Sequence, residues 1–358
     1  MKIVRIGLII GLALLLAVAV IRTAFAEQIG MALFKRVAER TISQDKLARL
    51  PDGLHVVLVG TGSPLADPTR AGPMTAVIAG DRIFVIDAGG GAVRKMQELG
   101  LPLNKVEATL LTHFHSDHID GLGELILQAW GGGGRETPLP VYGPTGVEQV
   151  VSGLKESYAQ DTVYRIAHHG PVVMNPSGQG ATAMPFDASA GTVRVLDEDG
   201  LIITAVPVHH QPAEPAVGYR FDYAGRSVTI SGDTARSESL IALARDSDIL
   251  VHEALNTEMV GIIGADLAAV GSPKIAQIMA DIPSYHTSPV DAASSAQEAG
   301  AKALVFTHII PVLPSRALYP AFLKGTDKAF DGPIVLGEDG MVFSLPADGS
   351  KMKRSRLD

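Results

Sequence analysis

Short apolar runs separated by turn residues fill the chain from Leu54 to about residue 345. Runs of this kind predict β-strands, and apolar positions three and four residues apart predict helices. The predicted strands are 55–59, 74–79, 82–86, 108–112, 201–206, 227–231, 249–251, 303–307, 334–336 and 341–345. The predicted helices are 91–99, 121–130, 145–158, 237–244 and 289–299. Strands interleaved with helices indicate a layered α/β architecture.

Two segments break this pattern. Residues 131–134 are all glycine, and residues 175–191 are rich in Gly, Pro, Ala, Ser and Thr. Both are typical of exposed loops, and long loops in compact domains often form lids or substrate arms. We therefore expect 131–191 to contain a substrate loop or arm, with a surface insertion as the equal alternative.

The N-terminus has the features of a secretory signal. Lys2 and Arg5 precede an uncharged apolar run over residues 6–21, and Ala24 and Ala26 provide the small residues of a cleavage site. We predict a signal peptide at 1–26, a leader helix at 27–53, one domain at 54–345 and a tail at 346–358. The mature chain would be periplasmic or secreted, and an uncleaved inner-membrane anchor is the alternative.

The charge balance is acidic. Lys and Arg number 30 and Asp and Glu 38, a net charge of −8. Residues 1–26 contain three cationic side chains, Lys2, Arg5 and Arg22, and no Asp or Glu. Without them the net charge is 27 − 38 = −11. This argues against a nucleic-acid binder with a generally basic surface, although a local basic patch remains open.

The chain has no cysteine, which excludes disulfides, thiolate zinc sites and cysteine nucleophiles. A metal site must then come from histidines and carboxylates. His113, His115, Asp117 and His118 fall within six positions after an apolar strand. Residues two apart in an extended chain share a face, so His113 and His115 can point together while the following turn directs Asp117 and His118 to a second point. The pattern predicts two metal ions side by side.

This segment resembles the His-x-His-x-Asp-His signature of the metallo-β-lactamase superfamily of binuclear hydrolases. Other features fit the same family: a glycine-rich turn at 60–64, Asp87 after a strand, and the Ser-Gly-Asp-Thr turn at 231–234. The resemblance implies a four-layer αβ/βα sandwich that covers roughly residues 54–345.

The resemblance also implies the ligands of two divalent ions, which we expect to be zinc. His113, His115 and His210 would hold one ion, Asp117, His118 and His308 the other, and Asp233 would bridge them. His209 is the alternative to His210. A hydroxide that bridges the ions would be the nucleophile, and Asp117 could accept its proton.

Two further segments are similar to the ribonuclease Z and arylsulfatase-like branch of the family. They are His252-Glu253-Ala254 and His286-Thr287-Ser288. In that branch the second histidine protonates the leaving oxygen, a role that falls to His286 here, and Glu253 would orient it. The chain departs from the first motif after Ala254, where Leu255 stands in place of the expected threonine and Asn256 follows.

The substrate expectation rests on the candidate arm. Residues 162–191 hold one arginine, Arg165, besides His168 and His169, whereas tight RNA binding needs several phosphate contacts. We therefore expect an exported binuclear zinc hydrolase of a small phosphodiester or aryl sulfate, with no nucleic-acid partner and membrane contact only through an uncleaved signal. The alternatives are a lactone or β-lactam hydrolase, a ribonuclease Z-type endoribonuclease, and a non-catalytic ligand-binding member. The apolar segment 260–285 leaves a homodimer contact open.

Overall fold

The computed structural model describes residues 2–42, 46–47, 50–349 and 351–357, which divide into two compact units at Lys46 and Leu47. The first unit holds α1 (Lys2–Ala24) and α2 (Ala26–Ile42). Within α1, Arg5–Ala24 is long and apolar enough to cross a membrane, a test that signal sequences also pass. Residues 1, 43–45, 48–49, 350 and 358, which belong to the predicted signal, leader segment and tail, lie outside the described residues.

The second unit is built on two β-sheets. The first sheet has the order β15 (Lys353–Arg356), β14 (Met341–Pro346), β1 (Gly53–Gly60), β2 (Met74–Ala79), β3 (Arg82–Ile86), β4 (Val106–Leu110), β5 (Leu139–Pro144) and β6 (Ala181–Phe186). The second has the order β13 (Ile334–Leu336), β12 (Leu304–Ile310), β11 (Ile249–Leu255), β10 (Arg226–Ile230), β9 (Val217–Tyr223), β8 (Leu201–Pro207) and β7 (Val193–Glu198).

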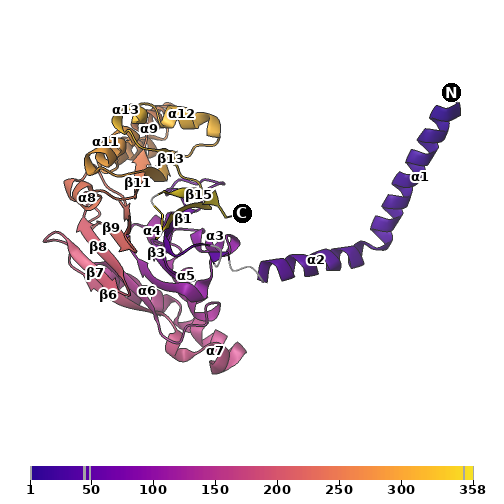
Figure 1. Cartoon of the computed structure of the whole chain (residues 1–358), viewed down its shortest axis with the longest axis horizontal. Helices are drawn as coiled ribbons and strands as arrows, with labels where there is room; N and C mark the ends of the chain where they lie inside the picture. The colour runs from indigo at the N-terminus through magenta and orange to yellow at the C-terminus, as the bar shows by residue number, and fades with distance from the viewer. Residues whose placement is uncertain (1, 43–45, 48–49, 350, 358) are drawn as a thin grey trace. The chain divides into compact units, whose positions relative to one another are not determined.

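Side chains from both sheets pack against each other in a shared core, in which Phe84 of β3 meets Phe221 of β9 with ring centroids 6.3 Å apart. The outer face of the first sheet packs on α3 (Ala92–Glu98), α5 (Leu122–Gly131) and α6 (Val147–Ser157). The outer face of the second packs on α8 (Glu238–Leu243), α11 (Pro289–Ala299), α12 (Tyr319–Phe322) and α13 (Thr326–Ala329). Figure 1 shows these helices on opposite sides of the paired sheets. The predicted four-layer sandwich is confirmed.

The strand directions bring several loops to one edge of the sandwich. β3 and β4 pair in parallel, as do β10, β11 and β12. Parallel strands end at the same edge of a sheet, which is where open α/β sheets usually carry their sites. All seven residues of β11 are buried, as expected for a strand covered on both faces.

Some predicted loops are regular structure. Residues 175–191 were expected to be an exposed loop, yet 181–186 form β6, which pairs in parallel with β5. Side chains of β6 are only half-buried or exposed, so the strand has no continuous apolar run to reveal it. Residues 159–173 form α7 (Ala159–Val173), and the apolar segment 260–285 lies mainly in α9 (Thr257–Ala269) and α10 (Pro273–Asp281). The basic tail contains β15, an edge strand paired with β14.

Candidate metal centre and active site

Three histidine nitrogens from two separate loops converge on one point. His113 and His115 follow β4, and His210 follows β8. His115 Nδ1 lies 3.0 Å from His113 Nε2 and 3.2 Å from His210 Nε2. His113 and His210 are buried while His115 is exposed, so this point is open to solvent on one side. The structure therefore brings together the three residues expected to hold the first ion.

A second group adjoins the first. His308 Nε2 lies 3.3 Å from Asp117 Oδ2, and His118 Nε2 lies 3.6 Å from the same oxygen. Asp233 Oδ2 stands between the groups, 3.3 Å from Nε2 of both His118 and His308 and 3.9 Å from Nε2 of both His113 and His210. This is the placement expected of a bridging carboxylate.

Local backbone features place the side chains of His308 and Asp233 in the centre. The register between β11 and β12 shifts so that Glu253 pairs with Thr307 and Ala254 with Ile309, which leaves His308 as an extra residue with φ 46°. Such a bulge redirects a side chain. Gly232 precedes Asp233 at φ 63°, and a Cβ there would lie 2.8 Å from the Val217 carbonyl oxygen. Glycine is required at this turn because any larger residue would collide with β9.

Asp87 orients two of the histidines from behind. Its Oδ2 accepts hydrogen bonds from His118 Nδ1 at 2.8 Å and from the Thr112 hydroxyl at 2.8 Å. Because that hydroxyl donates to Asp87, it accepts from His113 Nδ1 at 3.1 Å. His210 Nδ1 similarly donates to the Tyr285 carbonyl at 2.9 Å. All three rings therefore present Nε2 to the centre, the outer-shell arrangement common in metal sites.

The donor set fits divalent cations. Because Nδ1 carries the hydrogen in His113 and His210, Nε2 of each ring is an unprotonated acceptor. Both of these acceptors face His115 Nδ1, which has at most one hydrogen and can donate it to only one of them. His118 Nε2 is buried and has no hydrogen-bond partner among the described residues. Buried acceptors that face one another are costly unless a cation lies between them. Imidazole and carboxylate ligands suit zinc and related ions.

The electrostatics of three histidines agree with metal binding, whereas for His118 burial is outweighed by the Asp233 and Asp87 carboxylates, which raise its pKa. Burial lowers the pKa of His113, His115 and His210, which keeps these imidazoles in the neutral form that binds metals. Burial alone would raise the pKa of Asp233, but His308 and His118 hold it well below its ordinary value. The bridging position therefore carries a carboxylate charge at neutral pH.

His286 and Glu253 form a pair beside the two groups. Glu253 Oε1 accepts from His286 Nδ1 at 3.1 Å and from the Thr287 backbone N–H at 2.9 Å. The His286 ring lies 5.1 Å from the His210 ring and 5.6 Å from the His308 ring. Burial opposes the charged form of His286, but the Glu253 carboxylate outweighs it and raises the pKa to about 9. His286 is therefore protonated at neutral pH. Its ring lies close enough to His210 and Asp233 to form a candidate metal-ligating group with them.

The structure separates the sequence alternatives. His210 lies in the cluster, whereas the His209 side chain is exposed outside it. His252 is buried, directs Nδ1 to the Glu253 carbonyl at 2.7 Å, and belongs to none of the metal-ligating groups found among the described residues. The sequence indicates no role for Asp87 beyond its place after a strand, and no motif points to Thr112 or Tyr285. The adjacency of Thr112 to His113 was the available signal for the former.

Comparison with known proteins matches residues 82–309 to the family model described as beta-lactamase superfamily domain. A ribonuclease Z of Mycobacterium bovis (strain BCG / Pasteur 1173P2) is 36% identical over 290 residues, covering 80% of this chain and 96% of that protein. Among solved structures, the metallo-beta-lactamase fold protein YhfI from Bacillus subtilis has a TM-score of 0.58 at 20% identity, covering 81% of this chain and 99% of its own. Human tRNase Z, short form, has a TM-score of 0.57 at 21% identity, with 82% and 99% covered.

These relatives correct the expected substrate. The sequence led us to a small phosphodiester or aryl sulfate and to the exclusion of nucleic acid, and both expectations are wrong in view of relatives named ribonuclease Z that match over most of the chain. The error lies in the charge argument. The net charge is an average over the whole surface, and the candidate arm is only one part of that surface. RNA contacts depend instead on the local electrostatic potential where the substrate lies.

Proposed function

Because the chain belongs to the metallo-β-lactamase superfamily of hydrolases, in its ribonuclease Z branch, we propose that it is a metal-dependent endoribonuclease that cleaves a phosphodiester bond of RNA. The observation that carries the proposal is the 36% identity to a ribonuclease Z over 96% of that protein's length. The paired His286 and Glu253 beside the candidate metal centre support the same reaction class.

In this proposal the centre would take two divalent cations, zinc being the expected metal. His113, His115 and His210 would hold one, Asp117, His118 and His308 would hold the other, and Asp233 lies where it could reach both. Bound there, such ions would supply an activated water and neutralise phosphate oxygens. Asp87 and the Tyr285 carbonyl keep the ligand nitrogens aimed at the ions.

The protein's own proton chemistry follows from position and charge. Asp117 is the carboxylate placed to accept a proton during attack, because its Oδ2 lies beside His118 and His308 at the partly exposed edge of the centre. His286 donates a proton to the departing ribose oxygen. Glu253 is a positioning residue that holds His286 in orientation and in its charged form.

Cleavage of a defined RNA tests this function. End-labelled transfer RNA transcript is chosen because the human structural neighbour is a tRNase Z, and it is incubated with zinc-loaded protein and with protein treated with a chelator. The expected result is discrete cleavage that is lost on chelation and regained when zinc is restored. An absence of cleavage by protein that carries two zinc ions, on this RNA and on unstructured RNA alike, would overturn the proposal.

We further propose that α1 directs the chain to a membrane, as a cleaved signal at 1–26 or as an uncleaved anchor. The support is its apolar stretch Arg5–Ala24, which is entirely unburied within the structure. Cell fractionation with N-terminal sequencing tests this. A mature N-terminus at Glu27 identifies a cleaved signal, and an intact chain in the membrane fraction identifies an anchor. An intact chain in the soluble fraction contradicts both.

A further inference from the structure

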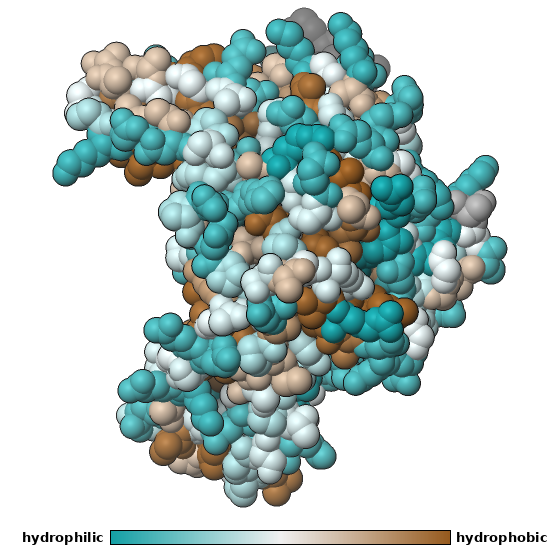
Figure 2. All heavy atoms as spheres, turned by 90° about the vertical axis from the view of Figure 1, so that its left-hand side faces the viewer, coloured by the Kyte–Doolittle hydropathy of each residue, from teal (hydrophilic) through white to brown (hydrophobic). Residues whose placement is uncertain are grey.

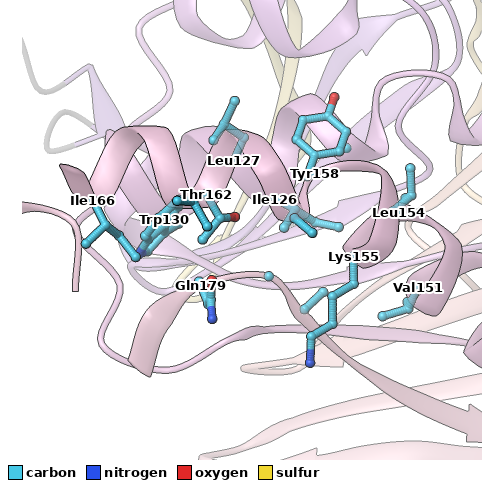
Figure 3. A pocket seen from close by; sticks show the side chains of 15 residues that line it. Ile126, Leu127, Trp130, Val151, Leu154, Lys155, Tyr158, Thr162, Ile166 and Gln179 are labelled. Atoms are coloured by element: carbon cyan, nitrogen blue, oxygen red, sulfur yellow. The ribbon is translucent and has the colours of Figure 1, made fainter. Parts of the chain in front are cut away.

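A cavity of about 310 Å³ lies between α5, α6, α7 and β6, lined by none of the residues of the metal centre. Figure 3 shows side chains from several helices directed into it. Its volume is about ten times a water molecule's share of liquid volume, roughly 30 Å³. Cavities of this size and larger are typical of small-molecule sites.

Most of the lining is apolar. Ile126 and Leu127 come from α5, Val151 and Leu154 from α6, and Ile166 from α7. Trp130 forms another wall, and its indole N–H is already satisfied because it donates to the Asn175 carbonyl at 2.7 Å. The ring therefore offers the cavity only its apolar surface.

Two polar side chains lie at one end of this apolar lining. Figure 3 shows the Lys155 ammonium and the Gln179 amide directed toward the same side of the cavity. Neither group has a hydrogen-bond or ion-pair partner within the part of the chain that the structure describes. The cavity thus combines an apolar body with a cation and an amide at one end, which complements a molecule with an apolar chain and an anionic head.

The opposite wall is closed by a tight contact. A Cβ added to Gly123 of α5 would lie 2.6 Å from the Tyr158 ring, so glycine at this position allows the ring to pack directly on the helix. Tyr158 stands between α6 and α7 and also lines the cavity. The wall is thereby built from the junction of these helices, the region that the sequence marked as a substrate arm.

We propose that this cavity binds a fatty carboxylate with a single chain of about ten carbon atoms, its head group against Lys155 and Gln179. The charge of Lys155 selects an anion over a neutral alcohol. The cavity volume selects one chain over the two chains of a phospholipid. This inference is independent of the proposed RNA cleavage, and its outcome is read without any activity measurement.

Trp130 is the only tryptophan of the chain, so its fluorescence reports on the cavity alone. Full-length protein is titrated with 11-bromoundecanoate, whose bromine quenches indole emission on contact, and with the matching bromo-alcohol. We expect saturable quenching by the acid below its aggregation concentration. Lys155→Met should weaken the acid about fivefold, the scale of an exposed ion pair, and leave the alcohol unchanged. The matched control Lys274→Met, on α10, should change neither.

Thr162→Phe fills the cavity from α7 and should abolish quenching while the circular dichroism spectrum and thermal midpoint stay those of the parent. Quenching that never saturates, or that survives Thr162→Phe in folded protein, would overturn the proposal. Equal weakening of acid and alcohol by Lys155→Met would overturn the assignment of the head group. Tighter binding of a lysophospholipid than of the carboxylate would contradict the choice of ligand class.

Discussion

His209 and His210 are adjacent, yet only His210 enters the candidate metal centre. We predict that His210→Ala lowers bound zinc from two ions per chain to about one, because the first group loses one of its three nitrogens. His209→Ala is the matched control and should keep both ions, since its side chain is exposed. Metal analysis after dialysis measures this. Equal zinc content in the two variants would show that His210 is not a ligand.

Asp87 acts through the residues it orients. Asp87→Ala removes the acceptor of His118 Nδ1 and of the Thr112 hydroxyl. We expect zinc affinity to fall by roughly 10- to 100-fold, the usual effect of losing such a partner, with the ligands themselves intact. Competition with a chromogenic chelator measures the affinity. Unchanged affinity in a folded variant would show that the histidines need no orienting carboxylate.

Glu253 sets the protonation range of His286. The active form of a general acid is protonated, so activity should fall as pH rises through the His286 pKa of about 9. Glu253→Gln removes the charge that raises this pKa, so the alkaline limb of the pH profile should move to lower pH while zinc content stays the same. The profile of kcat/KM between pH 6 and 10 measures it. An unchanged alkaline limb in Glu253→Gln would show that Glu253 does not set the pKa of His286.

At the scale of the elements, a buried ion pair joins β10 to the start of β11. Asp248 accepts from Arg226 Nε and Nη2 at 3.0 Å each and from Lys302 Nζ at 2.8 Å. Burial would raise the pKa of Asp248, but these cations lower it overall. Its stabilisation is therefore complete above the ordinary carboxyl pKa and is lost as pH falls through the lower folded value.

Removing one partner of this pair should be costly, because it leaves the Arg226 guanidinium buried without its carboxylate. We predict that Asp248→Asn destabilises the domain by about 3 kcal/mol. Urea unfolding at pH 7 measures it, with Asp187→Asn at an exposed loop as the control. The difference between the parent and Asp248→Asn should shrink toward pH 3, and a constant difference would contradict the electrostatic origin.

The sequence predicted most of the buried elements, although it missed β5, whose residues are a mixture of buried and half-buried. Residues 289–299 were predicted as a helix and form α11, whose alanines pack on the second sheet. β6 was missed because its side chains are half-exposed, and its pairing with β5 is a tertiary contact without a local signal. The bulge at His308 was equally invisible, since it depends on the register of β12 against β11.

At the scale of the whole molecule, the sequence could group the histidines but could not show how the groups meet. His113 and His308 lie on different sheets and are brought to Asp233 by the common direction of the strand ends. The substrate prediction was wrong for a related reason. It relied on the net charge of the whole chain, which does not describe the charge of the surface near the site. Figure 2 shows hydrophilic and hydrophobic side chains interspersed across one face of the molecule.

We propose that RNA is cleaved at this centre with His286 as the general acid. The most direct test is kcat/KM for one end-labelled RNA with the zinc-loaded parent and with His286→Ala, each with its zinc content measured. The account predicts metal-dependent cleavage by the parent and a loss of roughly 10²- to 10⁴-fold in His286→Ala, with two zinc ions retained by both. Undiminished cleavage by His286→Ala, or no cleavage by the fully loaded parent, would contradict it.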